Sequence, residues 1–129
     1  MSILIAVFAA LAAALHVYIF WMESLAWTGA AARKTFGPAT DAEVDATRAF
    51  AYNQGFYNLF LAVISVIGIV FLFASDSAVG PALILAGTGS MLAAAAVLFL
   101  SDASKRRAAI TQGLFPLLTV VATVIALSV

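Results

Sequence analysis

The residues best suited to chemistry lie in the stretch HVYIFWMESLAW, where the chain's only histidine, His16, is followed seven residues later by Glu23. On a helix this spacing places the two side chains on nearly the same face, about two turns apart. An imidazole exchanges protons near neutral pH. Because ionisable groups are costly in hydrocarbon, the pair predicts either a structural link between helices or a polar site inside a membrane.

The composition is that of a membrane protein. Of the 129 residues, 65% are hydrophobic and 9% are charged, and the mean hydropathy is +1.14. Charged residues make up roughly a quarter of an ordinary soluble domain. The formal net charge is zero, which gives no electrostatic case for a nucleic-acid partner. The absence of cysteine excludes disulfides, thiolate catalysis and cysteine-bound metals, and the sequence implies no cofactor.

Four segments meet the requirement of about 20 mainly apolar residues for a transmembrane helix. They cover roughly residues 3–25, 53–74, 81–101 and 108–128. Because they use nearly the whole chain, the sequence predicts a single all-α domain, an integral membrane four-helix bundle. The first segment could be mistaken for a signal peptide, but it has no preceding basic residue and its apolar run continues to Phe20. We expect it to be retained as a span.

The connection between the first two spans carries clear helix signals. Gly37 and Pro38 stop any helix, and Thr40 with Glu43 has the form of a capping box. The second helix is therefore expected to begin near Asp41 and to extend about two to three turns beyond the bilayer into the cytoplasm.

Two further prolines have predicted places. Pro81 suits the first position of the third span, where its missing N–H has no cost. Pro116 lies inside the fourth span and cannot donate to the carbonyl of Gln112, so a kink and a free backbone acceptor are expected there.

The basic residues predict the orientation, because Lys and Arg near span ends are retained on the cytoplasmic side. All of them fall in the first and third connections: Arg33, Lys34, Arg48, Lys105, Arg106 and Arg107. With an even number of spans these connections share one side, so both termini are expected to face away from the cytoplasm.

This orientation gathers the polar side chains of the spans in the inner half of the membrane. At 1.5 Å rise per residue, Glu23 lies near the cytoplasmic edge and His16 about 10 Å deeper. The candidate ligand-binding residues at this level are His16, Glu23, Arg48, Asn53, Gln54, Tyr57, Asn58 and Gln112.

Two interpretations of this cluster remain open. Asn, Gln and His often hold spans together by interhelical hydrogen bonds, and a Glu at a span end is often solvated at the interface. The gathering of so many polar groups at one depth favours a ligand pocket. Two contacts are predicted within it, one between His16 and Asn58 and an ion pair between Glu23 and Arg48. The alternative for Arg48 is a pair with Asp45 on its own helix.

The same residues carry a resemblance to a known family. The chain resembles the small bacterial membrane family catalogued as domain of unknown function 1304 over almost its whole length. The motifs that carry it are HVY at 16–18, Glu23, Trp27, RKTFG at 33–37, NQGFYN at 53–58 and QGLFP at 112–116. The resemblance implies a four-span membrane protein and no particular activity.

A more distant likeness is to the membrane-associated proteins of eicosanoid and glutathione metabolism, which are trimers of four-span subunits. Arg48-Ala49 and the run LFLA at 59–62 are similar to their second span. Gly55, however, stands where that family has Glu, and the third span has neither Arg nor Tyr. The likeness therefore implies the architecture and not glutathione chemistry.

These observations favour a non-catalytic membrane protein that binds a small polar or amphipathic ligand in the cytoplasmic half of the bundle, with a role in transport as an extension. The alternatives are a glutathione-transferase-like membrane enzyme and an accessory subunit of a larger membrane complex. We expect a homo-oligomer, a trimer or dimer, in the bacterial inner membrane, with the lipid bilayer as its surroundings and no nucleic-acid partner.

Overall fold

A computed structural model describes residues 1–37, 39–74 and 77–128, and this part of the chain is helical, without strands. Helix α1 (Ser2–Phe20) runs directly into a π-helical turn, η1 (Trp21–Leu25). The short helix α2 (Ala30–Phe36) follows. Helix α3 (Asp41–Ala74), helix α4 (Val79–Ser101), the 3-10 turn η2 (Ala103–Lys105) and helix α5 (Arg106–Ser128) complete the chain.

Four of these helical segments are long and apolar enough to cross a membrane: Ser2–Leu25, Asp41–Ala74, Val79–Ser101 and Ala103–Ser128. Each overlaps one of the four predicted spans. Helix α3 has 34 residues, which corresponds to about 51 Å at 1.5 Å per residue. It is therefore much longer than the roughly 30 Å hydrocarbon core of a bilayer.

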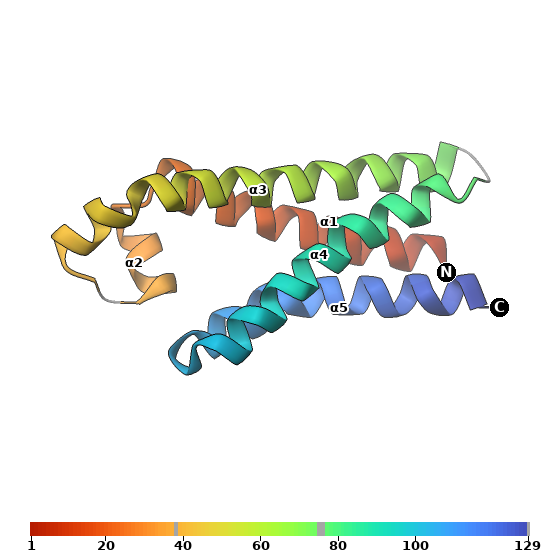
Figure 1. Ribbon diagram of the computed structural model, residues 1–129. Helices are drawn as coiled ribbons and strands as arrows, with labels where there is room; N and C mark the ends of the chain where they lie inside the picture. Colours follow the sequence, from red (N-terminus) through yellow and green to blue (C-terminus); the bar gives the residue numbers. More distant parts are fainter. Residues whose placement is uncertain (38, 75–76, 129) are drawn as a thin grey trace.

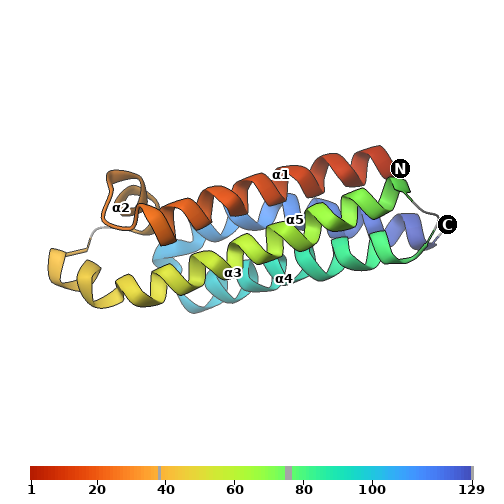
Figure 2. The same ribbon diagram turned by 90° about the horizontal axis from the view of Figure 1, so that it is seen from above.

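The four long helices form a bundle in which each packs against two neighbours. Helix α1 contacts α3 and α5, and α4 contacts the same two helices from the opposite side. The N- and C-termini lie at one end of the bundle, while α2 and the turn between α4 and α5 lie at the other (Figures 1 and 2). The six basic residues therefore lie towards the end opposite the termini, which we call the basic end.

Small side chains fill most of the core. Ala9, Ala12, Ala13 and Ala62 are buried, so the helices approach closely, as expected where no hydrophobic force acts between spans. The backbones of α3 and α4 come close at Gly80 of α4, where an added Cβ would lie 2.6 Å from the backbone nitrogen of Leu72. A side chain at this position would force α3 and α4 apart.

The hydroxyl groups in the core are satisfied locally. Thr88, Thr119 and Thr123 are buried, and each donates to the carbonyl four residues earlier on its own helix, at 2.7 to 2.8 Å. Such bonds remove the cost of burying a polar group without linking helices.

The capping box that the sequence predicts is confirmed. The Thr40 backbone N–H donates to Glu43 Oε2 at 2.8 Å, and the Glu43 N–H donates to Thr40 Oγ1 at 3.3 Å. Helix α3 begins at Asp41 as expected. Gly37, with a φ of 99°, follows the end of α2, while Pro38 lies outside the described residues.

Of the two other prolines, Pro81 differs from expectation in its place in the helix. Helix α4 begins at Val79, so Pro81 is its third residue and not its first. The first N–H groups of a helix have no intrahelical partner, so a proline is tolerated at this position too. Helix α5 continues through the buried Pro116 from Arg106 to Ser128.

Candidate functional site

The site begins where α1 changes its winding. The Ala26 N–H donates to the carbonyl of Trp21 at 2.9 Å, five residues earlier, which defines the π turn. Turns of this kind are rare and often mark functional positions. Here the π turn carries Glu23, which is half-buried where the membrane-length helix ends.

Glu23 is held by α3. Asn58 Nδ2 donates to Glu23 Oε2 at 2.8 Å, and the same nitrogen lies 3.3 Å from the Gln54 carbonyl of its own helix. An amide donor to a carboxylate is a charge-assisted hydrogen bond, which is stronger than one between neutral groups. The position of the carboxylate is therefore fixed by a side chain 35 residues later in the chain.

Gly55 allows this approach. A Cβ at Gly55 would collide with Ser24 Oγ and would lie 3.1 Å from both Glu23 Cβ and the Phe20 carbonyl oxygen. Ser24 Oγ itself donates to the Tyr52 carbonyl at 2.7 Å, which fastens the π turn to α3. The glycine is thus required by close packing between η1 and α3.

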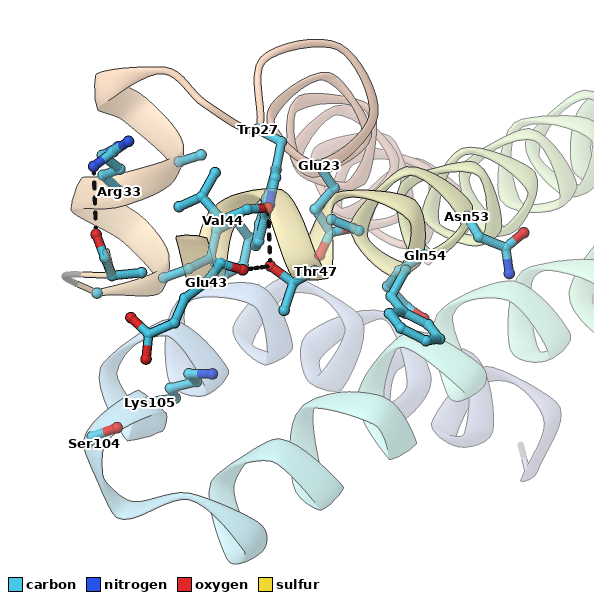
Figure 3. Close-up of a pocket in the computed structure, with 16 residues that line it drawn as sticks. Glu23, Trp27, Arg33, Glu43, Val44, Thr47, Asn53, Gln54, Ser104 and Lys105 are labelled. Carbon is cyan, nitrogen blue, oxygen red and sulfur yellow. Dashed lines mark hydrogen bonds between the residues drawn. The ribbon is translucent and has the colours of Figure 1, made fainter. Parts of the chain in front are cut away.

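A cleft of about 750 Å³ opens beside Glu23 at the basic end (Figure 3). Its walls come from η1, α2, the first turns of α3 and the turn η2. They combine aromatic, amide and charged side chains: Glu23, Trp27, Arg33, Phe36, Glu43, Thr47, Phe50, Asn53, Gln54, Ser104 and Lys105. Apolar and polar groups therefore face the same space.

The wall formed by α2 is held by several contacts. Trp27 Nε1 donates to the Val44 carbonyl at 3.1 Å, and the rings of Trp27 and Phe36 lie 5.5 Å apart. Arg33 forms an ion pair with Asp41 at 2.6 Å, which joins α2 to the start of α3. These contacts hold α2 and the rest of the first connection against the start of α3, so that they form one wall of the cleft.

The opposite wall carries Ser104 and Lys105 in the turn η2. Asp102 Oδ1 accepts hydrogen bonds from the Ser104 hydroxyl at 2.6 Å and from its N–H at 2.9 Å. These bonds, the hydroxyl first among them, hold the pKa of Asp102 below its usual value. Lys105 Nζ lies 3.6 Å from Asp102 Oδ2. The Asp102 carboxylate therefore contacts both of the residues that η2 contributes to the cleft.

The structure brings some of the predicted site residues together. Glu23, Asn53 and Gln54 line the cleft, and Asn58 holds Glu23. Arg48 lines a second cavity of about 30 Å³, which also touches Glu23.

Tyr57 and Gln112 do not line either of these two cavities. Tyr57 is 56% exposed on the outside of the bundle, and Gln112 is half-buried on α5.

His16 is predicted to contact Asn58, but the structure shows no hydrogen bond between the two. His16 is buried, and its Nδ1 pairs with the Ala12 carbonyl on its own helix at 2.9 Å. The Asn58 amide is already engaged by Glu23. His16 is therefore a core residue of α1 and does not line the cleft.

The predicted ion pair between Glu23 and Arg48 is not formed as a direct contact, although both residues line the small second cavity. Within the described residues Arg48 forms no ion pair closer than 4.0 Å, with Glu23 or with the alternative partner Asp45. Glu23 is bonded to Asn58, which lies ten residues after Arg48, or about 15 Å along the axis of α3. Arg48 is exposed near the helix start.

Most of the residues that line the cleft are not predicted from the sequence. Trp27, Phe36 and Phe50 supply its apolar wall, and Arg33 and Glu43 lie near its mouth. The sequence feature that points to this region is the capping box, because it sets where α3 begins and therefore where the first connection ends. Among the residues that the structure describes, no three His, Asp or Glu side chains lie close enough together to hold a metal ion.

Comparison with known proteins gives a family but no activity. No curated protein and no solved structure matches the chain. The family described as protein of unknown function (DUF1304) matches residues 10–124, which include the second half of α1, the cleft and most of α5. With nearly the whole sequence matched, and with four helices that suit a small four-span architecture, the chain belongs to the DUF1304 family.

Proposed function

We propose that this protein binds a small amphipathic ligand in the cleft at the basic end and does not itself catalyse a reaction. The observation that carries the proposal is the mixed lining of a space of about 750 Å³, where Trp27, Phe36 and Phe50 face the same volume as Glu23 and Gln54. Ligand sites typically occupy about 300–1,000 Å³ and combine apolar walls with a few polar groups.

The π turn supports the same assignment. It places a carboxylate on the wall of the cleft and fixes it with a hydrogen bond from another helix. A polar group retained at a costly position and held in one orientation is typical of a binding site.

The experiment is to purify the protein in a mild detergent and identify the small molecules that accompany it by mass spectrometry. Thr47→Trp should fill the cleft, because Thr47 lines it and is exposed. Ala46→Trp is the matched control, since Ala46 is exposed on the same helix and does not line the cleft. We expect an amphipathic compound with the wild type and the control, and its loss from Thr47→Trp. Equal retention by all three proteins would contradict the proposal.

We further propose that the protein resides in the bacterial inner membrane as a homo-oligomer, a dimer or trimer, with the cleft on the cytoplasmic side. The basic residues around the cleft support this orientation. Exposed alanines on α1 and α4 would let another copy approach closely: Ala10, Ala14, Ala93, Ala94 and Ala96. The mass of the purified particle, corrected for detergent, tests the assembly. A monomer, or co-purification of other chains in fixed ratio, would contradict it.

A further inference from the structure

Four charged side chains line the cleft, and the two cations are already paired. Arg33 lies 2.6 Å from Asp41, and Lys105 lies 3.6 Å from Asp102. Neither aspartate lines the cleft. The positive charges at the cleft are therefore balanced by carboxylates outside it.

The two acidic residues of the cleft, in contrast, have no such charged partner among the described residues. Within the described part of the chain, neither Glu23 nor Glu43 forms an ion pair closer than 4.0 Å. Glu43 belongs to the capping box and faces Lys105 across the mouth in Figure 3. Among the described residues, the hydrogen-bond donor to Glu23 is a neutral amide, that of Asn58. The inner wall thus carries a carboxyl group without a direct counterion among the described residues.

One oxygen of Glu23 is available to a ligand. Oε2 accepts the bond from Asn58, and no hydrogen bond to Oε1 is formed among the described residues. In the same part of the chain, no fully buried side-chain oxygen lacks a partner. Oε1 therefore retains accessible surface, and Glu23 lines both cavities.

The surroundings of this carboxylate suit a large, weakly hydrated cation. Trp27 lines both cavities that Glu23 touches, and Phe36 packs against Trp27 at 5.5 Å between ring centroids. Aromatic faces attract cations that lie within about 6 Å of the ring centre. Phe50, which is 79% exposed, adds apolar surface to the same cleft.

We propose that the ligand of the cleft is a lipophilic cation, with an ammonium-type or phosphonium-type charge held by Glu23 and Trp27 and its apolar groups against Phe36 and Phe50. This inference rests on the proposed function, because it names the class of ligand for the same cleft. The charge of the ligand would supply the counterion that Glu23 lacks.

Arg48 is the residue that could oppose this assignment. It lines the small cavity with Glu23, but it is exposed and more than 4.0 Å from the carboxylate. The cavity of about 30 Å³ has room for about one water molecule between them. Removal of the Arg48 charge should therefore leave cation binding unchanged or strengthen it.

The test uses two probes of nearly the same shape and opposite charge, tetraphenylphosphonium and tetraphenylborate. Binding to the purified protein is measured by equilibrium dialysis in a neutral maltoside detergent. We expect saturable binding of the phosphonium and a loss of about tenfold or more in affinity with Glu23→Gln, because a charged contact is removed. Asp45→Asn is the control, since Asp45 is exposed on α3 and lines neither cavity. Arg48→Gln should bind the phosphonium at least as tightly as the wild type.

A second measurement uses the wild-type protein and does not depend on the folding of a variant. A hydrophobic carbodiimide modifies accessible carboxyl groups, and peptide mass spectrometry reports the modification of Glu23. Tetraphenylphosphonium should protect Glu23, and tetraphenylborate should not.

Tighter binding of tetraphenylborate, unchanged phosphonium affinity in Glu23→Gln, or equal protection by both probes would overturn the inference. The proposed function fails separately. If Thr47→Trp retains the same co-purified compound as the wild type, the cleft is not the site. If the compound is lost from Thr47→Trp but is neutral or anionic, the cleft is the site and only the cation assignment is wrong.

Discussion

At the scale of single residues, the site depends on how one carboxylate is held. Glu23 is half-buried at the end of an apolar helix, and the Asn58 amide is its hydrogen-bond donor at 2.8 Å. Desolvation disfavours a charged carboxylate, and a fixed donor offsets part of that cost. Asn58 therefore positions Glu23 and does not itself line either of the two cavities.

Replacement of Asn58 should test this dependence. Asn58→Leu removes the donor and leaves the carboxylate without a partner, so we expect a loss of about 1–3 kcal/mol in the free energy of unfolding. Chemical denaturation in detergent micelles measures it. Asn53→Leu is the control, because Asn53 is exposed and should change the stability little. An equal loss in both variants would show that the hydrogen bond from Asn58 to Glu23 contributes no more to the free energy of unfolding than an exposed asparagine does.

At this scale the sequence places Glu23 at the end of the first span but does not predict its hydrogen-bond partner, Asn58. Spacing indicated a polar group at the end of the first span, and Glu23 does line the cleft. The partner was missed because the π turn has more residues per turn than an α-helix, which rotates Glu23 relative to His16. Sequence periodicity assumes regular winding and cannot show such a rotation.

At the scale of elements, the contact between η1 and α3 depends on Gly55. Gly55→Ala would place a methyl group against Ser24 Oγ, Glu23 and the Phe20 carbonyl. We expect a destabilisation of about 1–3 kcal/mol, typical of overpacking, and weaker ligand retention because Glu23 must move. Thermal unfolding followed by circular dichroism measures the first effect. The double variant Ser24→Ala with Gly55→Ala should recover part of the stability.

Gly89 gives the matched control for this substitution. It also lies inside a long helix, but an added Cβ there would meet nothing within 4 Å. Gly89→Ala should leave the protein as stable or slightly more stable, by up to about 1 kcal/mol, because alanine favours the helix. A similar loss in both glycine variants would indicate that close packing at Gly55 is not the cause.

The start of α3 provides a second prediction at this scale. Thr40→Ala removes the hydroxyl that accepts from the Glu43 N–H, so the first turn of α3 should open more readily. Hydrogen exchange of the amides in residues 41–44 should accelerate, while exchange near Gly68 in the core should not change. Unaltered exchange in the first turn would show that the tertiary contacts of α2 alone hold it.

The elements differ in how well the sequence predicts them. The start of α3 follows from local chemistry, since Thr40 and Glu43 cap each other without help from the rest of the fold. Helix α2 was not predicted because seven residues are too few for a stable isolated helix. It is held by tertiary contacts of Trp27 and Arg33, and no local pattern encodes these.

At the scale of the whole molecule, the arrangement in the membrane can be tested by cysteine labelling, because the chain has no native cysteine. Ser77→Cys and Ser128→Cys lie towards the end that carries the termini, and Ser104→Cys lies at the basic end. We expect impermeant thiol reagents added outside intact cells to label the first two and not the third. Labelling at position 104 from outside would reverse the orientation.

The fold of the whole molecule was largely predictable because physical lengths constrain it. Bilayer thickness sets the length of a span, and short connections force neighbouring helices to run antiparallel. The number of long helices and the shared end of the termini follow from these two facts. The cleft could not be predicted in the same way, because it depends on where Phe50 and Lys105, from distant parts of the chain, lie relative to Trp27.

The length of α3 has a consequence for how a ligand would reach the cleft. If the hydrocarbon core ends at Ala74, counting about 30 Å back along α3 reaches Gln54, and the part of the helix that lines the cleft would lie at the level of the lipid headgroups. A lipophilic molecule concentrates at this level by partitioning into the leaflet. Occupancy of the cleft in vesicles would then depend on the mole fraction of the compound in the lipid. The total aqueous concentration would affect occupancy only by setting how much of the compound partitions into the lipid.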